Sequence, residues 1–293
     1  MGALEGAAGF AAAERGLSMT ETKAGVSAGL SGATRLVPVL AHPVDHVRAP
    51  AAYNPAFAAA GLDWCMVAMG VHPDDFAATV GRLGRLSNLQ GLNLTIPHKS
   101  AGHALCERLG AEARRTGVVN TMRIEPDGIW AGESFDGVGF VAAARAHRVL
   151  RVDEPVMLFG AGGAGTAIAF ALASAGVSRL HVHDSDAGRA SRLLDALREM
   201  HPALRASSDA DEGLRKAGLA INATPLGLHS GDPLPFDPAL LRAGAAVFDI
   251  TAARDTELMA AAAERALAVV GGRPMIDHQV AAQIAFWRGA EFR

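Results

Sequence analysis

The chain has 293 residues, of which 50% are hydrophobic and 19% are charged, and its formal net charge is -3. This composition is typical of a globular protein that is large enough for two domains. It contains no basic tract that would bind phosphates, and its apolar runs are shorter than the roughly 20 residues of a membrane-spanning helix. We therefore expect neither nucleic acid nor membrane as a partner.

The cysteines and the first residues bear on the cellular compartment of the protein. The two cysteines, Cys65 and Cys106, have no metal-type spacing, so we expect no disulfide scaffold, no metal site and a reducing, cytoplasmic location. Residues 1–32 are rich in Gly and Ala without a clear period, which predicts a flexible tail. Glu5 and Glu14 in this segment argue against a signal peptide.

Strand-like and helix-like segments alternate from Thr34 onward. Each of the first three predicted strands is followed by a predicted helix, and the segment 117–134 is predicted as a hairpin that turns at Pro126-Asp127-Gly128. The strands are 35–41, 64–70 and 91–97, and the helices are 50–62, 74–86 and 98–110.

The alternation begins again after Asp136. Four more strands are predicted, and each is followed by a helix, so the sequence predicts two successive α/β units with largely parallel sheets and a hinge at 135–139. These strands are 156–160, 179–185, 219–225 and 245–251.

A glycine-rich turn opens the second unit. Gly160, Gly162 and Gly165 follow a hydrophobic strand directly and lead into an Ala-rich helix, with Gly163 and Ala164 in the same turn. Glycines let the backbone approach a pyrophosphate, and the helix N-terminus presents free N–H groups to it. Because strand-to-helix turns also use glycine for packing alone, the dinucleotide prediction depends on an acidic residue at the end of the next strand.

Asp184 is that acidic residue. Its carboxylate can accept hydrogen bonds from the adenosine ribose hydroxyls, and its charge repels the 2′-phosphate of NADP, so we predict NAD as the cofactor. A helix cap at this point, in which Ser185 or Asp186 takes part, is the structural alternative. Arg189 and Arg192 keep NADP as the alternative cofactor.

Six motifs follow one another from residue 93 to residue 287. They are NLTIPHK at 93–99, VVNT at 118–121, SFDGVGF at 134–140, GAGGAG at 160–165, NATPLG at 222–227 and MIDHQVAAQIAFW at 275–287. In their order and spacing they resemble the shikimate dehydrogenase family, and the resemblance covers nearly all of the chain from residue 34. It implies a two-domain α/β fold, with a substrate-binding domain formed by 33–135 and 275–293 and a Rossmann-type dinucleotide-binding domain at 136–274.

The resemblance also implies roles for single residues. Lys99 matches the family's catalytic lysine and Asp136 its partner, a pair suited to exchange a proton with the reacting hydroxyl while hydride moves to the nicotinamide. A solvated lysine at a helix start is the alternative for Lys99. The positions that hydrogen-bond the ring hydroxyls are matched by Asn93, Thr95, Asn120 and Gln279.

Three further matches lie on the expected nicotinamide side of the cofactor. They are Asn222, Thr224 and Met275, and each has a structural alternative, a turn for the first two and plain packing for the methionine.

The chain departs from the family where two serines normally bind the substrate carboxylate. Val47 and Ala49 stand in their place and donate no hydrogen bond, so Arg48 or His46 would have to replace them. Arg48 as a solvated turn residue is the alternative. Ala252, Ala253 and Phe135 differ from the family as well, which suggests a divergent substrate.

We therefore predict an oxidoreductase, monomeric or homodimeric, that moves hydride between a nicotinamide cofactor and a ring hydroxyl of a cyclic polyol carboxylate such as shikimate or quinate. One alternative is a dehydrogenase for an aminated or other non-shikimate substrate. The other is a nucleotide-binding protein of this family that has lost turnover; retention of both Lys99 and Asp136 argues against it.

Overall fold

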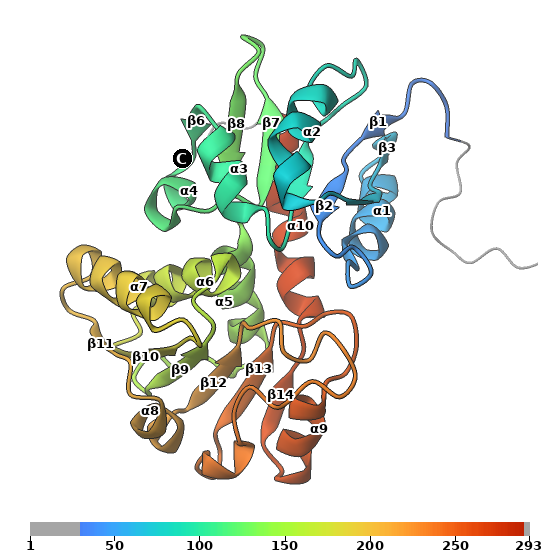
Figure 1. The fold of residues 1–293 in the computed structure, drawn as a ribbon. Coiled ribbons are helices and arrows are strands. Elements are labelled where there is room, and N and C mark those ends of the chain that lie inside the picture. Colours follow the sequence, from blue (N-terminus) through green and yellow to red (C-terminus); the bar gives the residue numbers. More distant parts are fainter. Residues whose placement is uncertain (1–29, 290–293) are drawn as a thin grey trace, which may run out of the picture.

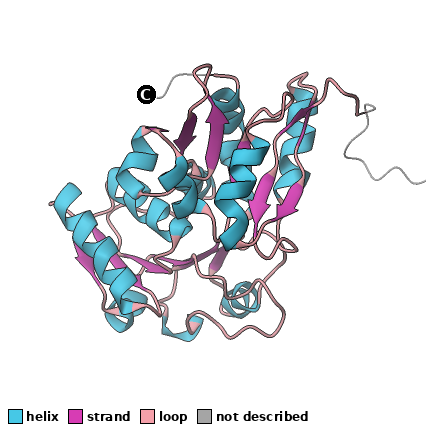
Figure 2. Ribbon diagram, turned by 45° about the horizontal axis from the view of Figure 1, so that its top comes forward, coloured by secondary structure: helices cyan, strands magenta, loops and turns pink. Residues whose placement is uncertain are grey.

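The computed structural model describes residues 30–289, so the predicted tail lies outside the described residues up to residue 29. Two six-stranded sheets form two halves, which are stacked one above the other in Figure 1. Figure 2 shows helices covering the strands in both halves. The predicted α/β class is confirmed. No helix within the described range combines the length and apolarity needed to cross a membrane.

The sheet of the second half is entirely parallel and has the order β11-β10-β9-β12-β13-β14. Its four central strands coincide with the predicted ones: β9 (Val156–Phe159), β10 (Arg179–His183), β12 (Leu219–Asn222) and β13 (Ala246–Asp249). The edge strands β11 (Arg205–Ser207) and β14 (Ala268–Val270) were not predicted, because each has only three residues and at most one of them is buried.

Helices cover both faces of this sheet. The cluster on one face joins Leu158 to α5 (Asp136–Ala146), α6 (Gly163–Ser174) and α7 (Ala187–Met200). The cluster on the other face joins Met157 to α8 (Ala210–Lys216) and α9 (Glu257–Glu264). Successive residues of β9 therefore serve two different cores, as the alternation of side chains along a strand requires.

The predicted helix between β12 and β13 is wrong. Residues 223–245 form a loop whose one helical turn is the 3-10 helix η2 (Pro238–Leu240). Prolines at 225, 233, 235 and 238 remove backbone donors, and Gly227 and Gly231 adopt positive φ angles of 100° and 84°, so an α-helix cannot run through this segment.

The sheet of the first half is mixed, with the order β4-β2-β5-β7-β8-β6. Only the pairs β2·β4, β2·β5 and β6·β8 are parallel, because the predicted hairpin of β7 and β8 brings in antiparallel neighbours. Gly128 lies in its turn with φ 88°. The strands are β2 (Val39–Ala41), β4 (Ala68–Gly70), β5 (Leu92–Leu94), β6 (Arg108–Leu109), β7 (Thr121–Ile124) and β8 (Trp130–Glu133).

Two predicted strands of this half are each broken in two. The segment 35–41 divides at Pro38, which has no N–H for a ladder, and its first part, β1 (Arg35–Leu36), pairs instead with β3 (Trp64–Cys65) in a separate two-stranded sheet. The segment 64–70 divides as well, into β3, which pairs with β1, and β4, which pairs with β2.

The helices of this half are shorter than predicted. The predicted helix 98–110 ends at Leu105, since Arg108 and Leu109 pair with β8 as an edge strand. The helices are α1 (Ala49–Ala59), η1 (Pro73–Asp75), α2 (Phe76–Leu83), α3 (Lys99–Leu105) and α4 (Ala111–Thr116).

Helices α5 and α10 (Arg273–Trp287) join the halves, and α10 returns the chain to the first half (Figure 1). Met275 lies in the core of the second half, whereas Phe286 and Trp287 lie in that of the first. Helix α5 approaches α10 so closely that a Cβ on Gly139 would be 2.6 Å from the Met275 carbonyl oxygen. This arrangement supports the discontinuous division at 33–135 with 275–293 and 136–274, whose boundaries stay a prediction.

Candidate active site

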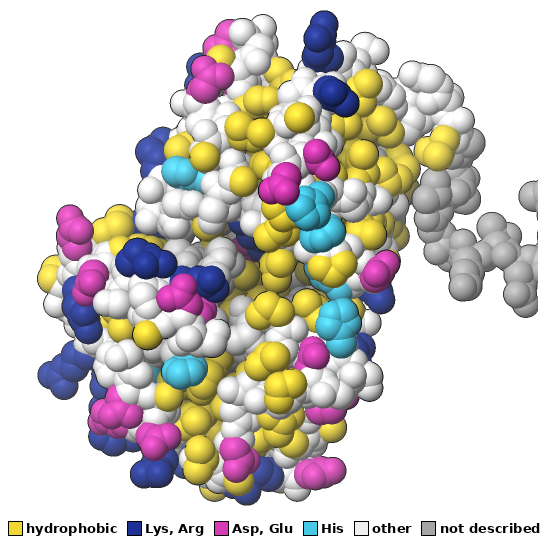
Figure 3. Space-filling model, in the orientation of Figure 1, with side chains coloured by type: hydrophobic (Ala, Val, Ile, Leu, Met, Phe, Trp, Pro, Cys, Tyr) yellow, Lys and Arg dark blue, Asp and Glu magenta, His cyan; other side chains and the backbone are white. Residues whose placement is uncertain are grey.

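A cleft of about 1010 Å³ lies between the halves, and Figure 3 shows the surface hollowed there. Residues at or just beyond the carboxyl ends of β5, β9, β10 and β12 line it, which is where open α/β sheets bind ligands. The predicted residues that line it are Arg48, Asn93, Thr95, Lys99, Asn120, Asp136, Gly160, Gly162, Gly163, Ala164, Asp184, Thr224, Met275 and Gln279.

Lys99 and Asp136 form a buried ion pair in this cleft. Lys99 Nζ lies 2.5 Å from Asp136 Oδ2, and the two residues are only 8% and 5% exposed. Each is the first residue of a helix, α3 for Lys99 and α5 for Asp136, and the N-terminus of α5 adds its partial positive charge to the stabilisation of the carboxylate. The solvated alternative for Lys99 is therefore wrong, because its ammonium group is held inside the cleft.

The amide side chains of Asn93, Asn120 and Gln279 line the cleft beside this pair, and we call them the amide floor. Asn120 Nδ2 donates to Gln279 Oε1 at 2.9 Å, and Asn120 Oδ1 accepts from the Phe135 N–H at 3.0 Å. Thr95 follows β5 at the cleft, and its hydroxyl has no protein partner in the part of the chain that the structure describes. These three predicted substrate residues, together with Asn93, thus lie within one pocket.

Sequence reasoning missed Gln283 and Tyr53, which orient this floor. Gln283 is fully buried; its Oε1 accepts from Tyr53 Oη and from Asn93 Nδ2, and its Nε2 donates to Gln279 Oε1 at 2.8 Å. Two donors therefore occupy Gln279 Oε1, which fixes the orientation of its amide and turns the Nε2 donors away from Gln283. The spacing of four residues between Gln279 and Gln283 on one helix was the available signal.

The glycine-rich turn has the geometry of a phosphate cradle. Gly160 adopts φ 101°, and a Cβ on Gly165 would lie 1.9 Å from the Gly160 carbonyl oxygen, so the strand and α6 approach too closely for any side chain there. A Cβ on Gly162 would meet nothing within 4 Å, and Gly162 precedes the first turn of α6. The turn thus leaves open space in front of free helix N–H groups.

The Asp184 carboxylate accepts a hydrogen bond from the backbone of this turn. Its Oδ2 accepts from the Ala161 N–H at 2.7 Å and its Oδ1 from the Asp186 N–H at 2.9 Å. Asp186 caps α7, as the structural alternative predicted, by accepting from the Arg189 N–H at 3.1 Å; Asp184 itself is not the cap. Arg189 Nη1 lies 3.7 Å from Asp184 Oδ2, and Arg189 and Arg192 both line the cleft.

Asn222 differs from Thr224 and Met275 in that it does not line the cleft. It is fully buried, and its Oδ1 accepts from the Thr224 N–H at 3.0 Å and from Thr224 Oγ1 at 2.7 Å. Its Nδ2 donates to Asp249 Oδ1 at 3.1 Å. Asn222 is therefore placed to hold Thr224 at the cleft rather than to touch a ligand.

The wall at the start of α1 is apolar, as its sequence predicts. Val47 and Ala49 pack against the cluster that contains Tyr53 and Phe57. Arg48 is exposed, and its Nη1 donates to the Asp45 carbonyl at 2.7 Å and to the Val47 carbonyl. Ala252 and Ala253 line the cleft.

Phe135 does not contribute to that wall. Its ring packs against Phe286 at a centroid distance of 5.9 Å, in the apolar cluster of the first half that also contains Tyr53 and Phe57. This part of the predicted pocket change is wrong, because Phe135 does not line the cleft and its side chain packs instead against the apolar cluster of the first half.

Comparison with known proteins decides the family. Residues 39–122 match the family model described as shikimate dehydrogenase substrate binding domain. A shikimate dehydrogenase (NADP(+)) of Rubrobacter xylanophilus is 39% identical over 267 residues, which cover 89% of this chain and 93% of the relative. The chain belongs to the shikimate dehydrogenase family.

Solved structures of the family agree with that assignment. The shikimate 5-dehydrogenase of Thermus thermophilus in complex with NADP(H) and shikimate superimposes with a TM-score of 0.77 at 31% identity, covering 87% of this chain and 94% of that one. The quinate dehydrogenase of Corynebacterium glutamicum in complex with NAD gives 0.76 at 26% identity, with the same coverage. This shikimate dehydrogenase family member is an oxidoreductase of the shikimate/quinate type that uses a nicotinamide cofactor and a small-molecule substrate.

Proposed function

We propose that this protein is an NAD-dependent dehydrogenase for a ring hydroxyl of a cyclic polyol carboxylate of the shikimate or quinate class. The observation that best supports this proposal is the buried Lys99–Asp136 ion pair, which lies in the same cleft as the amide floor and the glycine-rich turn. A cytoplasmic location and a monomeric or homodimeric state stay predictions.

The residues of the second half fit a nicotinamide dinucleotide. The open space in front of Gly162 and the free N–H groups of α6 suit the pyrophosphate, while Thr224 and Met275 suit the nicotinamide end. The bound cofactor supplies the hydride acceptor for alcohol oxidation.

The residues of the first half hold the substrate and its proton. Asn93, Thr95, Asn120 and Gln279 present amide and hydroxyl groups on rigid elements, and these groups orient a ring that carries several hydroxyls. Lys99 Nζ hydrogen-bonds the reacting oxygen and exchanges its proton, and Asp136 keeps the amine in place. Arg48 contributes a guanidinium at the mouth of the same pocket.

A substrate panel tests this function. Shikimate, quinate, an aminated analogue and a simple cyclic alcohol are assayed with NAD and with NADP separately. We expect turnover of a polyol carboxylate, with the higher kcat/KM for NAD. Turnover confined to the simple alcohol would refute the substrate class.

The cofactor preference depends on Asp184. Asp184→Ala should lower kcat/KM for NAD and raise the ratio of kcat/KM for NADP to that for NAD, because the variant removes the charge that repels a 2′-phosphate and one of the two acidic neighbours of Arg189. Steady-state kinetics with both cofactors measure the ratio. Asp186→Ala, which removes the cap of α7 and the other acidic neighbour of Arg189 but keeps Asp184, is the matched control. A wild type that already prefers NADP would contradict this assignment.

Gln283 should affect substrate binding although it does not line the cleft. Gln283→Leu removes the acceptor of Asn93 Nδ2 and one of the two donors to Gln279 Oε1, so the orientation of both amides is less restrained. We expect KM for the polyol to rise roughly 5- to 30-fold, equivalent to about 1–2 kcal/mol, with a smaller change in the KM for NAD. Tyr53→Phe removes one donor only and should have a smaller effect. Equal changes in both KM values would indicate general loosening instead.

A further inference from the structure

Asp249 carries a buried carboxylate that takes no part in the proton exchange. It is the last residue of β13, its exposed fraction is 0%, and it forms no ion pair among residues 30–289. A buried charge is unfavourable unless hydrogen-bond donors replace the water that it loses. The donors around Asp249 therefore show which parts of the chain depend on it.

Three donors from three parts of the chain converge on this carboxylate. Asp249 Oδ1 accepts from Asn222 Nδ2 at 3.1 Å and from the Thr251 N–H at 3.0 Å. Its Oδ2 accepts from the Thr256 hydroxyl at 2.8 Å. Asn222 ends β12, Thr251 follows β13 and Thr256 caps α9. One carboxylate thus joins the ends of two neighbouring strands to the start of a helix.

The contact with Asn222 determines the place of the segment 223–228. Asn222 Nδ2 also donates to the Leu226 carbonyl at 3.0 Å, so both of its amide hydrogens have acceptors and its Oδ1 is turned toward Thr224. The Thr224 hydroxyl in turn accepts from the Leu226 N–H at 3.1 Å. Thr224 and Leu226 both line the cleft. Asp249 therefore acts on this wall of the cleft through one amide.

The contact with the Thr251 N–H determines the place of the segment 251–253. Thr251, Ala252 and Ala253 line the cleft beside the segment 223–228. The Thr251 carbonyl accepts from the Gly272 N–H at 3.2 Å, which joins this segment to the start of α10. Both segments that line this end of the cleft therefore depend on the same carboxylate oxygen, Asp249 Oδ1.

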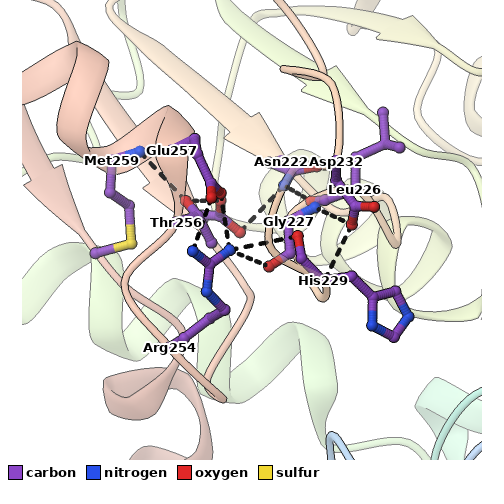
Figure 4. A network of polar contacts seen from close by, with 10 residues as sticks. Asn222, Leu226, Gly227, His229, Asp232, Arg254, Thr256, Glu257 and Met259 are labelled. Carbon is purple, nitrogen blue, oxygen red and sulfur yellow. Dashed lines mark hydrogen bonds and ion pairs between the residues drawn. The ribbon is translucent and has the colours of Figure 1, made fainter.

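Arg254 connects the two segments at the surface. Figure 4 shows it between Glu257 and the carbonyls of Gly227 and His229. Arg254 donates to Glu257 at 2.7 and 2.8 Å, and this hydrogen bond lowers the pKa of Glu257 to about 2, so the pair stays charged at neutral pH. The two side chains are 31% and 40% exposed, and water weakens such a pair. The buried Asp249 carboxylate is therefore the stronger connection.

We propose that Asp249 is a positioning residue for the nicotinamide end of the cofactor. It touches no ligand itself but places the segments 223–228 and 251–253 through Asn222 and Thr251. The proposal rests on the proposed function, which assigns the nicotinamide end to Thr224. Hydride transfer requires close alignment of the reacting atoms, so a small displacement of these segments costs rate.

The test compares NAD with ADP-ribose, which has the same adenosine and pyrophosphate but no nicotinamide. Asp249→Ala should raise the Kd for NAD roughly 3- to 10-fold and leave that for ADP-ribose within about twofold, because only NAD reaches the two segments. Calorimetry gives both constants without any turnover. If the substrate panel selects NADP, the pair becomes NADP and 2′-phospho-ADP-ribose.

Steady-state kinetics give a second readout. The kcat of Asp249→Ala should fall roughly 10-fold, while the KM for the polyol stays within about threefold, because no residue of the amide floor contacts Asp249. A role in stability alone would lower the melting temperature and leave this difference between kcat and KM absent.

Three further variants separate placement from charge and from stability. Asp249→Asn keeps an oxygen for Asn222 and Thr251 and should bind NAD almost as the wild type does. Thr256→Val removes the cap of α9 and the donor to Oδ2 but neither contact of Oδ1, so it should lower the melting temperature and leave both Kd values near those of the wild type. Asn222→Ala removes one of the three donors only; it should fold even if Asp249→Ala does not, and weaken NAD selectively.

The outcomes distinguish this proposal from the proposed function. A selective loss of NAD binding in a protein that turns over no compound of the panel would refute the function and support the role of Asp249. Equal weakening of NAD and ADP-ribose, unchanged NAD binding in both Asp249→Ala and Asn222→Ala, or a loss in Asp249→Asn equal to that in Asp249→Ala would overturn the positioning role.

Discussion

Lys99→Ala should lower kcat by a factor of roughly 10²–10⁴ while the affinity for the cofactor stays near that of the wild type. The reason is geometric: Lys99 Nζ is the ammonium group that Asp136 holds in the cleft at 2.5 Å, beside the amide floor that holds the ring. Its loss removes the group that exchanges the proton and leaves the hydride-accepting site in place. Steady-state kinetics with the preferred polyol and fluorescence titration of the cofactor give the two quantities.

Two further variants serve as controls for Lys99→Ala. Lys99→Ala leaves the Asp136 carboxylate buried without its partner, so Lys99→Met with Asp136→Asn, which removes both charges, should recover stability but not activity. Lys216→Ala removes an exposed lysine that pairs with Glu212 and should leave kcat near the wild-type value. Undiminished turnover by Lys99→Ala on a confirmed substrate would refute the catalytic assignment.

Gly165→Ala should destabilise the fold by up to about 3 kcal/mol, the upper part of the range for overpacking a close contact. The added Cβ would lie 1.9 Å from the Gly160 carbonyl oxygen, so α6 would have to move away from β9. A thermal melt should show a loss of several degrees, and cofactor affinity should fall because the phosphate cradle is displaced.

Gly162→Ala is the matched control, since its Cβ would meet no protein atom within 4 Å. This variant should melt within about 1–2 °C of the wild type, because only the cost of one surface substitution applies. Its cofactor affinity should nevertheless fall, because the methyl group fills the space in front of the helix N-terminus. Equal thermal losses for the two variants would show that the close approach at Gly165 is not what the fold requires.

The sequence alone determined the features that are local in the chain. The glycine-rich turn follows its strand directly, Lys99 follows β5 within a few residues, and the hairpin turns at Gly128, so each has its signal within a short window. The order of the motifs also determined the family and the α/β class. The edge strands and the broken strands escaped prediction because two or three residues carry no measurable period.

Only the tertiary structure decided which side chains meet. Gln283 is 190 residues from Asn93 and 230 from Tyr53, so its place beneath the amide floor follows from the packing of α10 against the first half. Asn222 belongs to a matching motif, yet the partners that surround β12 bury it and give the cleft to Thr224.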